Sequence, residues 1–258
     1  GNNDNNSESL IKSGAFSTDF PNGITMGLWI HRSYSQNNGQ QRGLITIGDD
    51  FNAASMPNGA PTIALGVTTD FRPYFEVRHI GQNNGYWSIQ TAISVNSWQN
   101  LAVTYDGSSV NNRPTFYLNG VSQSLSTAGT SPQQPAATMP TVTDKIPGHS
   151  RIGAIWGGSS GGGSGYAVIT GSTLDEVSIY SDVLTAADIS KIYCSGKVVN
   201  LTSSYAPKTS SLVTWLRLGD QVGATAPPTA AQLTASGTTN LERNFPNASK
   251  SVFFDVKG

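Results

Sequence analysis

The residues best suited to chemistry in this 258-residue chain are its sixteen carboxylates. A glycosidase typically holds two carboxyl groups about 5 to 10 Å apart across the scissile bond. Side chains of one strand share a face only at even spacing, and the only acids two or four positions apart are Asp4 and Glu8. Adjacent acids such as Asp175 and Glu176 would point to opposite faces of a regular strand. We therefore expect this pair to be a structural corner that accepts backbone or arginine hydrogen bonds, and we expect no catalysis.

Other motifs of catalytic type lack their usual context. The string GGSSG at 157–161 satisfies G-x-S-x-G, but no capped helix follows it. His31, His79 and His149 do not show the close spacing that is typical of zinc sites. The single cysteine, Cys194, cannot form a disulfide within the chain and is expected to be a buried or half-buried thiol.

Aromatic side chains beside polar loops could form platforms for sugar rings, because a ring face stacks on the apolar face of a sugar. Four residues border such loops and form the candidate glycan-binding set: Tyr34, Tyr86, Trp87 and Trp156.

The elements that must position these residues are predicted to be strands. Short segments alternate apolar and polar residues and are separated by turn residues, which is typical of strands with one buried face. Asn119-Gly120 and Asp106-Gly107 are hairpin signals, since such turns need positive φ. The polar stretch 126–150 is long enough to carry a binding surface or to pack across a sheet edge. Ten or more strands are expected, at 24–31, 43–48, 62–67, 74–80, 86–93, 98–105, 115–119, 150–156, 166–172, 174–180 and 212–218.

One short helix is predicted near residues 185–193. Thr185 and Asp188 form a capping-box-like start, and Gly196 is a natural stop. Apolar residues recur at helical spacing between them. The pattern is all-β with this one helix, which favours a two-sheet antiparallel sandwich or jelly roll.

The closing string LDEVSIYSDVLTAADISKIY resembles the end of the laminin G-like, concanavalin A-like jelly-roll family. Four further strings follow the order of that family: ITMGLWIH, SWQNLAVTYDG, PTFYLNGV and SRIGAI. The resemblance covers residues 16–193 and implies a jelly roll that follows a polar segment at 1–15. It also implies that Trp29 and Trp98 are core residues. Gln99-Asn100 departs from the family, which often has a histidine after the tryptophan, so no role of that histidine is carried over.

The resemblance also implies a rim calcium site, because related lectin domains often bind calcium through oxygen ligands. The candidate ligands are Asp49, Asp50 and Asn52 in GDDFN, and Asp106 in YDG. Turn capping is the alternative role for these residues.

Residues 194–258 are expected to add strands to the same sandwich or to a neighbour. Their first part resembles the segment that follows such domains in many marine bacteriophage proteins, through Trp215, Arg217, Gly219 and Asp220. The likeness implies a virion component, and virion modules of this kind are commonly symmetric homo-oligomers.

Composition excludes some partners. Charged residues make up 12% of the chain and the net charge is −1, whereas nucleic-acid binding needs a concentrated basic face. No apolar run approaches the roughly 20 residues needed to cross a bilayer. Three functions are left. The first is a non-catalytic capsid decoration, fibre or tail-associated protein on the virion surface, in contact with other virion proteins and polysaccharide. The second is a secreted bacterial adhesion lectin at the cell surface, and the third is a polysaccharide-degrading enzyme with acids from distant strands.

Overall fold

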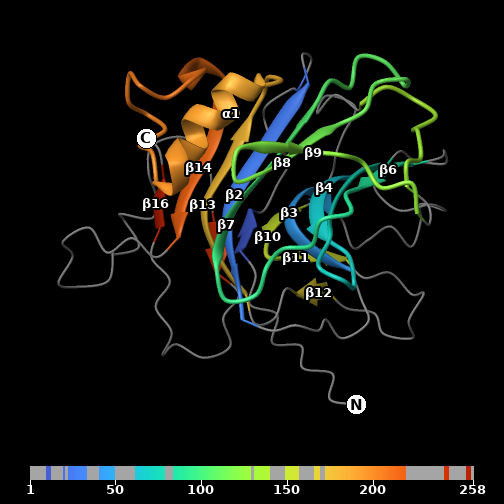
Figure 1. The fold of residues 1–258 in the computed structure, drawn as a ribbon, viewed down its shortest axis with the longest axis horizontal. Helices are drawn as coiled ribbons and strands as arrows, with labels where there is room; N and C mark the ends of the chain where they lie inside the picture. The colour runs from blue at the N-terminus through green and yellow to red at the C-terminus, as the bar shows by residue number, and fades with distance from the viewer. Residues whose placement is uncertain are drawn as a thin grey trace.

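The computed structural model describes most of the strand-forming chain. The described residues are 10–12, 20, 23–33, 41–49, 62–78, 84–128, 131–139, 149–156, 166–168, 172–218, 241–243 and 254–256. Within them lie two seven-stranded antiparallel sheets and one two-stranded ribbon (Figure 1). The predicted two-sheet antiparallel jelly roll is confirmed.

The first sheet has the strand order β15-β1-β10-β3-β4-β5-β6. Its strands are β1 (Leu10–Lys12), β3 (Arg42–Asp49), β4 (Thr62–Val67), β5 (Pro73–Arg78), β6 (Gly85–Ser88), β10 (His149–Ile152) and β15 (Leu241–Arg243). The ribbon pairs β11 (Ala154–Trp156) with β12 (Tyr166–Val168).

The second sheet has the order β16-β14-β13-β2-β7-β8-β9. Its strands are β2 (Ile24–Arg32), β7 (Trp98–Tyr105), β8 (Thr115–Leu118), β9 (Val121–Gln123), β13 (Ser172–Tyr180), β14 (Leu212–Leu218) and β16 (Phe254–Val256). Two strands of the C-terminal extension thus continue this sheet, since β14 pairs with β13 and β16 pairs with β14.

The core lies between the two sheets and follows from the alternation of their strands. Along β2 the inward positions are Ile24, Met26, Leu28 and Ile30, which are at most 1% exposed. They share one cluster with inward residues of β4, β5 and β7. Each fully buried side chain of this kind contributes about 1.5 to 3 kcal/mol.

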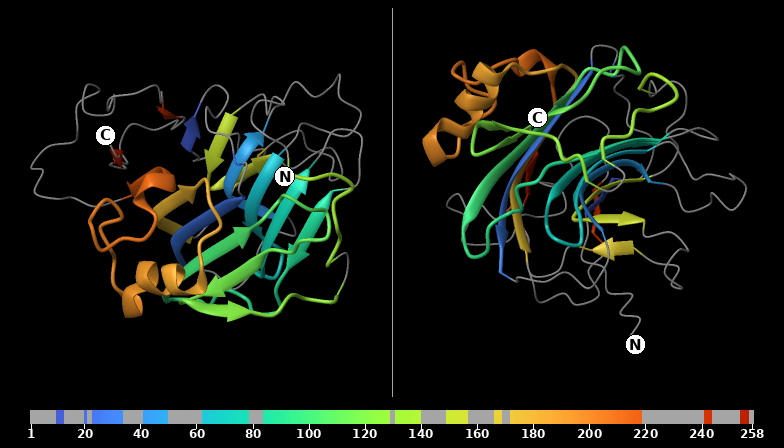
Figure 2. Two further views of the ribbon diagram at one scale, coloured as in Figure 1. Left: turned by 90° about the horizontal axis from the view of Figure 1, so that it is seen from above. Right: turned by 45° about the vertical axis from the view of Figure 1, so that its right-hand side comes forward.

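A second apolar cluster lies outside the second sheet, beneath the helix α1 (Ala186–Tyr193). Ile189 of α1 and Leu201 pack there on Ala102, Tyr180 and Trp215 from three strands. Figure 2 shows α1 on the outer side of this layer, away from the first sheet. One half of the outer face is therefore covered.

The predicted capping box of α1 is confirmed. Thr185 Oγ1 accepts a hydrogen bond from the Asp188 amide at 3.2 Å, and the Asp188 carboxylate accepts one from the Thr185 amide at 3.0 Å. The helix ends at Cys194, which has a left-handed backbone, and a 3₁₀ turn (Cys194–Gly196) follows. The Cys194 thiol is free and half-buried, as expected.

Two turn predictions had different outcomes. Asn119 and Gly120 have φ of 50° and 74° and join β8 to β9, so the two-residue hairpin is confirmed. Asp106-Gly107 instead opens the connection 106–114, in which the Asp106 carboxylate accepts the Ser108 amide at 2.9 Å. The strands β7 and β8 do pair as an antiparallel hairpin, but a longer loop joins them and not a two-residue turn.

The polar stretch after β9 runs along the edge of the first sheet. Gln133 exchanges two backbone hydrogen bonds of 2.8 Å with Tyr86, and Ser126 donates its amide to Ser88 at 2.7 Å. The described part of 126–150 therefore packs across a sheet edge, as expected. A second 3₁₀ turn (Thr209–Ser211) precedes β14.

Candidate functional site

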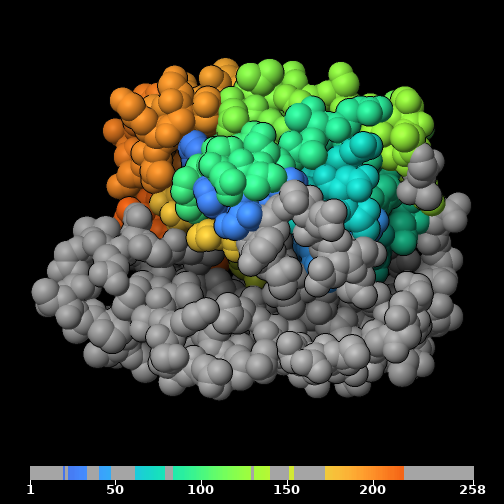
Figure 3. Space-filling view, turned by 60° about the horizontal axis from the view of Figure 1, so that its bottom comes forward, coloured from blue at the N-terminus to red at the C-terminus, as the bar shows by residue number. Residues whose placement is uncertain are grey.

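An aromatic strip occupies the part of the second sheet's outer face that α1 leaves open. The register places Trp29 opposite Asn100 and His31 opposite Trp98, so these side chains share the outer face. The strip consists of Trp29, His31, Trp98 and Tyr193. Figure 3 shows the neighbouring covered region, where α1 and the segment after it, in orange, lie beside the green residues near 100.

Trp98 is the most open member of the strip, with 46% of its surface exposed. Its ring centroid lies 5.5 Å from that of His31, at an interplanar angle of 53°. The two rings form a tilted pair on adjacent strands. Such a pair presents an apolar indole face beside an imidazole that can donate and accept hydrogen bonds.

Tyr193 extends the strip from the last residue of α1. Its ring stacks on Trp29 at 5.9 Å and 30°. This approach depends on Gly120, because a β-carbon there would lie 2.8 Å from the Tyr193 Cδ1 atom. The hairpin glycine thus serves both the positive φ of the turn and the position of the tyrosine ring.

Polar groups border the strip on β13. Thr173 pairs with His31, and Asp175 pairs with Trp29. One Asp175 carboxylate oxygen accepts the Glu176 amide at 2.8 Å. Carboxylate and hydroxyl groups beside stacked rings are the combination that recognises sugar hydroxyls at an apolar platform.

The neighbouring Glu176 confirms the predicted structural corner. The register of β13 shifts between Asp175 and Ser178, and Glu176 has φ of 51°, so the chain bulges there. The Glu176 carboxylate, on a residue only 6% exposed, accepts Trp215 Nε1 at 2.5 Å and Arg217 Nε at 3.4 Å. It is held inside the fold and does not face the strip as a free acid.

A small pocket separates the strip from the covered half. It measures about 20 Å³ and is lined by residues that include Trp29, Asn100, Tyr180 and Ile189. A site of this size holds about one water molecule. It is too small for a sugar.

The outer face of the first sheet is a second polar surface. Tyr74 and Tyr86 stack there at 5.4 Å, and the Glu76 carboxylate accepts Arg78 Nε at 2.8 Å. Gln41 Nε2 donates to the Tyr86 hydroxyl at 3.2 Å. Burial first, and then the Glu76 charge, raise the pKa of Tyr86 to about 12, and the bond from Gln41 opposes them. Tyr74 is fully buried, so this face offers less open aromatic surface than the strip.

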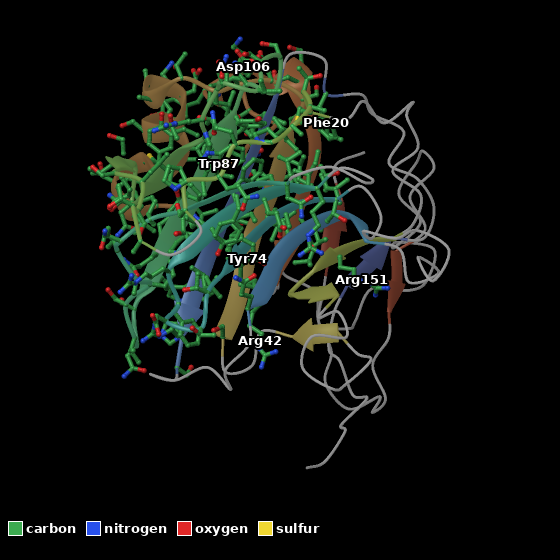
Figure 4. All side chains as sticks on the ribbon, turned by 90° about the vertical axis from the view of Figure 1, so that its right-hand side faces the viewer. Phe20, Arg42, Tyr74, Trp87, Asp106 and Arg151 are labelled. Atoms are coloured by element: carbon green, nitrogen blue, oxygen red, sulfur yellow. The ribbon has the colours of Figure 1, made fainter. Side chains whose placement is uncertain are left out.

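Two tryptophan predictions are corrected by the structure. Trp87 cannot be a sugar platform, because it is 0% exposed, packs at 5.3 Å from Tyr105 and donates its Nε1 hydrogen to Gln134 at 2.9 Å (Figure 4). Trp98 was expected in the core and instead lies exposed. Trp29 is half-buried.

Strand parity is the signal that could have separated these residues. In β7 the inward positions are Leu101, Val103 and Tyr105, so Trp98 has the parity of the outward residues. In β6, Trp87 has the parity of buried Ile89. Proximity to a polar loop was the weaker criterion. Of the other predicted platforms, Tyr86 lies half-buried on the first sheet, Tyr34 lies outside the described residues, and only the backbone of Trp156 is described.

The predicted calcium ligands are only partly described. Asp49 ends β3 and its side chain is not described, while Asp50 and Asn52 lie outside the described residues. Asp106 is exposed, and hydrogen bonds from the Ser108 side chain and backbone lower the pKa of its carboxyl group. Among the described residues, no three His, Cys, Asp or Glu side chains gather as a metal site. Calcium binding therefore stays a prediction.

Several described carboxylates serve structural contacts. Glu76 binds Arg78, Asp182 binds Lys208 Nζ at 2.8 Å, and Asp188 belongs to the helix cap. In the part of the chain that the structure describes, no helix is both long and apolar enough to span a membrane.

Comparisons with known proteins agree with the fold. A laminin G family model described as the concanavalin A-like lectin/glucanases superfamily matches residues 4–190. No curated protein sequence matches the chain significantly.

Among solved structures, a heptameric SAP-like pentraxin from Limulus polyphemus matches with a TM-score of 0.45 and 16% identity over 75% of this chain and 78% of its own. A putative carbohydrate binding protein from Bacteroides ovatus matches with a TM-score of 0.47 and 14% identity over 98% of this chain and 59% of its own. The Ruminococcus gnavus IT-sialidase CBM40 bound to α2,3-sialyllactose matches with a TM-score of 0.46 and 12% identity over 71% of this chain and 97% of its own. At these identities and TM-scores, the three structures carry no conclusion about what this chain binds.

Proposed function

Because the chain belongs to the concanavalin A-like lectin/glucanases superfamily, we propose that it is a non-catalytic glycan-binding protein of an exterior surface, and that it binds through the aromatic strip. The observation that carries the proposal is the 46% exposure of Trp98 beside the His31 ring. An indole this open adds little to folding, whereas it can stack on the apolar face of a sugar.

The shape of the strip suits an extended chain of sugars. Trp98 and His31 form one ring pair, and Trp29 and Tyr193 form a second pair two residues further along β2. Thr173 and Asp175 supply hydroxyl and carboxylate groups along one side. Two stacked subsites with polar flanks favour a polysaccharide over a single small sugar.

The first experiment is binding of the purified protein to an array of bacterial and algal polysaccharides, with calcium and again with a chelator. We expect Trp98→Ala to weaken binding at least about fivefold, because one stacked aromatic is worth roughly 1 to 3 kcal/mol. Tyr205→Ala is the matched control, since Tyr205 is 56% exposed but lies outside the strip. Equal binding by wild type and Trp98→Ala would refute the strip as the site.

The same array separates the roles proposed for metal and for catalysis. Binding that a chelator abolishes would support calcium at Asp49, Asp50, Asn52 or Asp106. Release of reducing sugar by the protein would contradict the non-catalytic proposal. An acid-to-amide scan of the chain would then identify the residues responsible.

We further propose that the exterior surface is that of a bacteriophage virion. The support is the resemblance of residues 194–220 to bacteriophage proteins, carried by Trp215 and Arg217 on β14. An antibody against the protein should then label purified particles, with the protein present in symmetric copies. Recovery only from culture supernatant or cell envelopes would favour a secreted bacterial adhesion lectin instead.

A further inference from the structure

Arg32 is a buried residue that pairs with no carboxylate among the residues the structure describes. It ends β2, is 7% exposed, and its guanidinium carbon lies 4.1 Å above the centroid of the Phe71 ring. Its Nε atom is buried and has no hydrogen-bond acceptor. Within the described residues, no ion pair joins Arg32 to a carboxylate. Burial lowers the pKa of its guanidinium group. A buried N–H that lacks an acceptor is costly, so the arrangement favours an acceptor at Nε.

Ser172 places a second hydrogen-bond donor beside this one. It is the residue of β13 directly opposite Arg32, and its Oγ atom is also buried without a partner. Opposed residues of antiparallel strands face the same side, with β-carbons about 4.5 to 5.5 Å apart. Arg32 and Ser172 therefore leave the same face of the sheet from opposed positions, and among the described residues neither Arg32 Nε nor Ser172 Oγ has an acceptor.

The surrounding backbone holds the two donors and the ring in place. Phe71 has φ of 57°, donates its amide to Thr68 at 2.9 Å and accepts the Ile93 amide at 2.9 Å. The Asn96 amide donates to the Arg32 carbonyl at 2.7 Å. The turn between β4 and β5 in the first sheet and the end of β2 in the second are therefore both fixed around the guanidinium.

We infer that Arg32 and Ser172 bind an oxyanion, the sulfate or carboxylate group of an acidic polysaccharide. A guanidinium N–H and a hydroxyl are natural donors to such a group, and Arg32 is charged at all physiological pH values. Two further charges lie in the adjoining turn, exposed Asp70 and half-buried Arg72, and they offset each other. The site lies at the same end of β2 as the aromatic strip but on the other face of the sheet, since His31 points outward and Arg32, the next residue, points toward the first sheet. The oxyanion site is inferred from Arg32 and Ser172 alone, whereas the assignment of the oxyanion to a polysaccharide rests on the proposed function.

Sulfate itself is the first probe, because it tests the site without any glycan. The backbone amide signals of residues 93–96 are followed by NMR during titration with sodium sulfate at constant ionic strength, with sodium chloride as the balance. We expect saturating shifts in the wild type. Shifts that do not saturate would overturn the site. They would reflect only the general effect of sulfate, which is excluded from protein surfaces and stabilises proteins without binding a site.

Three variants make the test specific. Arg32→Met keeps an unbranched apolar side chain but removes the guanidinium group, and should abolish saturation. Ser172→Ala should weaken sulfate binding about tenfold, as expected for a hydrogen bond to a charged group. Arg113→Met removes an exposed arginine elsewhere and should bind like the wild type. Should Arg32→Met fail to fold, Ser172→Ala still decides the outcome. Unchanged sulfate binding in Ser172→Ala and Arg32→Met would overturn the inference.

Polysaccharides then identify the source of the anion. Sulfated, uronic and neutral chains are compared for binding by the wild type and by Trp98→Ala. Preference for an acidic chain that is lost in Ser172→Ala supports the inference. Saturating sulfate binding without any polysaccharide binding would refute the proposed function while leaving the oxyanion site intact. Polysaccharide binding without saturating sulfate binding would refute the oxyanion site and leave the proposed function intact.

Discussion

The two halves of the second sheet's outer face are built from the same three strands, β2, β7 and β13, but differ in what covers them. At one end, Ala102 and Tyr180 lie beneath Ile189 of α1 and beneath Leu201. At the other end the rings of the aromatic strip face outward, and Trp98 is 46% exposed. Apolar area removed from water stabilises the fold, whereas open area does not. The comparison teaches that stability and binding are assigned to different halves of one surface.

Truncation in the covered half is expected to have the largest effect. Ile189 is 1% exposed, so Ile189→Ala should lower the free energy of unfolding by about 2 to 5 kcal/mol. Chemical denaturation measures this loss. A decrease below about 0.5 kcal/mol would mean that α1 is not an integral cover.

The boundary between the halves should respond next. Glu176→Gln removes the charge that binds Trp215 and Arg217 inside the fold. Because a hydrogen bond to a charged group contributes about 1.5 to 3 kcal/mol, we expect a loss in that range. A double-mutant cycle with Arg217→Met measures the interaction free energy between Glu176 and Arg217. If the losses of the two single variants add up to that of the double variant, the two residues are not coupled.

The helix cap is expected to matter less. Thr185→Ala should destabilise the protein by about 1 kcal/mol, since the Asp188 amide loses its acceptor. Thr185→Ser keeps that acceptor and is the control. Similar melting temperatures for the alanine variant and wild type would argue against a stabilising cap.

The open half should show the smallest effect on stability. We expect Trp98→Ala to change the free energy of unfolding by no more than about 0.5 kcal/mol, although it is expected to weaken glycan binding. Trp215→Ala, in the covered half, should cost about 3 to 5 kcal/mol and provides the contrast. Comparable losses for the two tryptophans would remove the distinction between the halves.

Local patterns predicted much of the fold. Alternation placed the strands, Thr185 and Asp188 placed the start of the helix, and Asn119-Gly120 placed a hairpin, because each depends on residues close in sequence. Two predicted strands were too long. The segment 86–93 leaves β6 after Ser88, and 150–156 divides at Gly153, which has φ of 80°. Both breaks depend on backbone bends that alternation does not reveal.

The candidate site was harder to predict, because it joins residues far apart in the chain. Trp98 and His31 meet only through the pairing of β7 with β2, and Tyr193 reaches Trp29 only after α1 folds back. The acids at 175 and 176 were interpreted as a corner, and the bonds of Glu176 to Trp215 and Arg217 bear this out, although the bulge breaks the regular alternation on which the interpretation rested. Strand parity places both Trp29 and Trp98 on the outer face, but which of the two is more open depends on where α1 ends, because Tyr193 stacks on Trp29.

The segment that pairs with β6 has a consequence for self-association. An open sheet edge is a template on which another chain can add a strand. Here Gln133 occupies the backbone groups of Tyr86, so the chain closes part of its own edge. At high local concentration, neighbouring copies therefore cannot pair their strands with the backbone of Tyr86 at that edge. Ordered assembly through this part of the edge would depend on side-chain contacts.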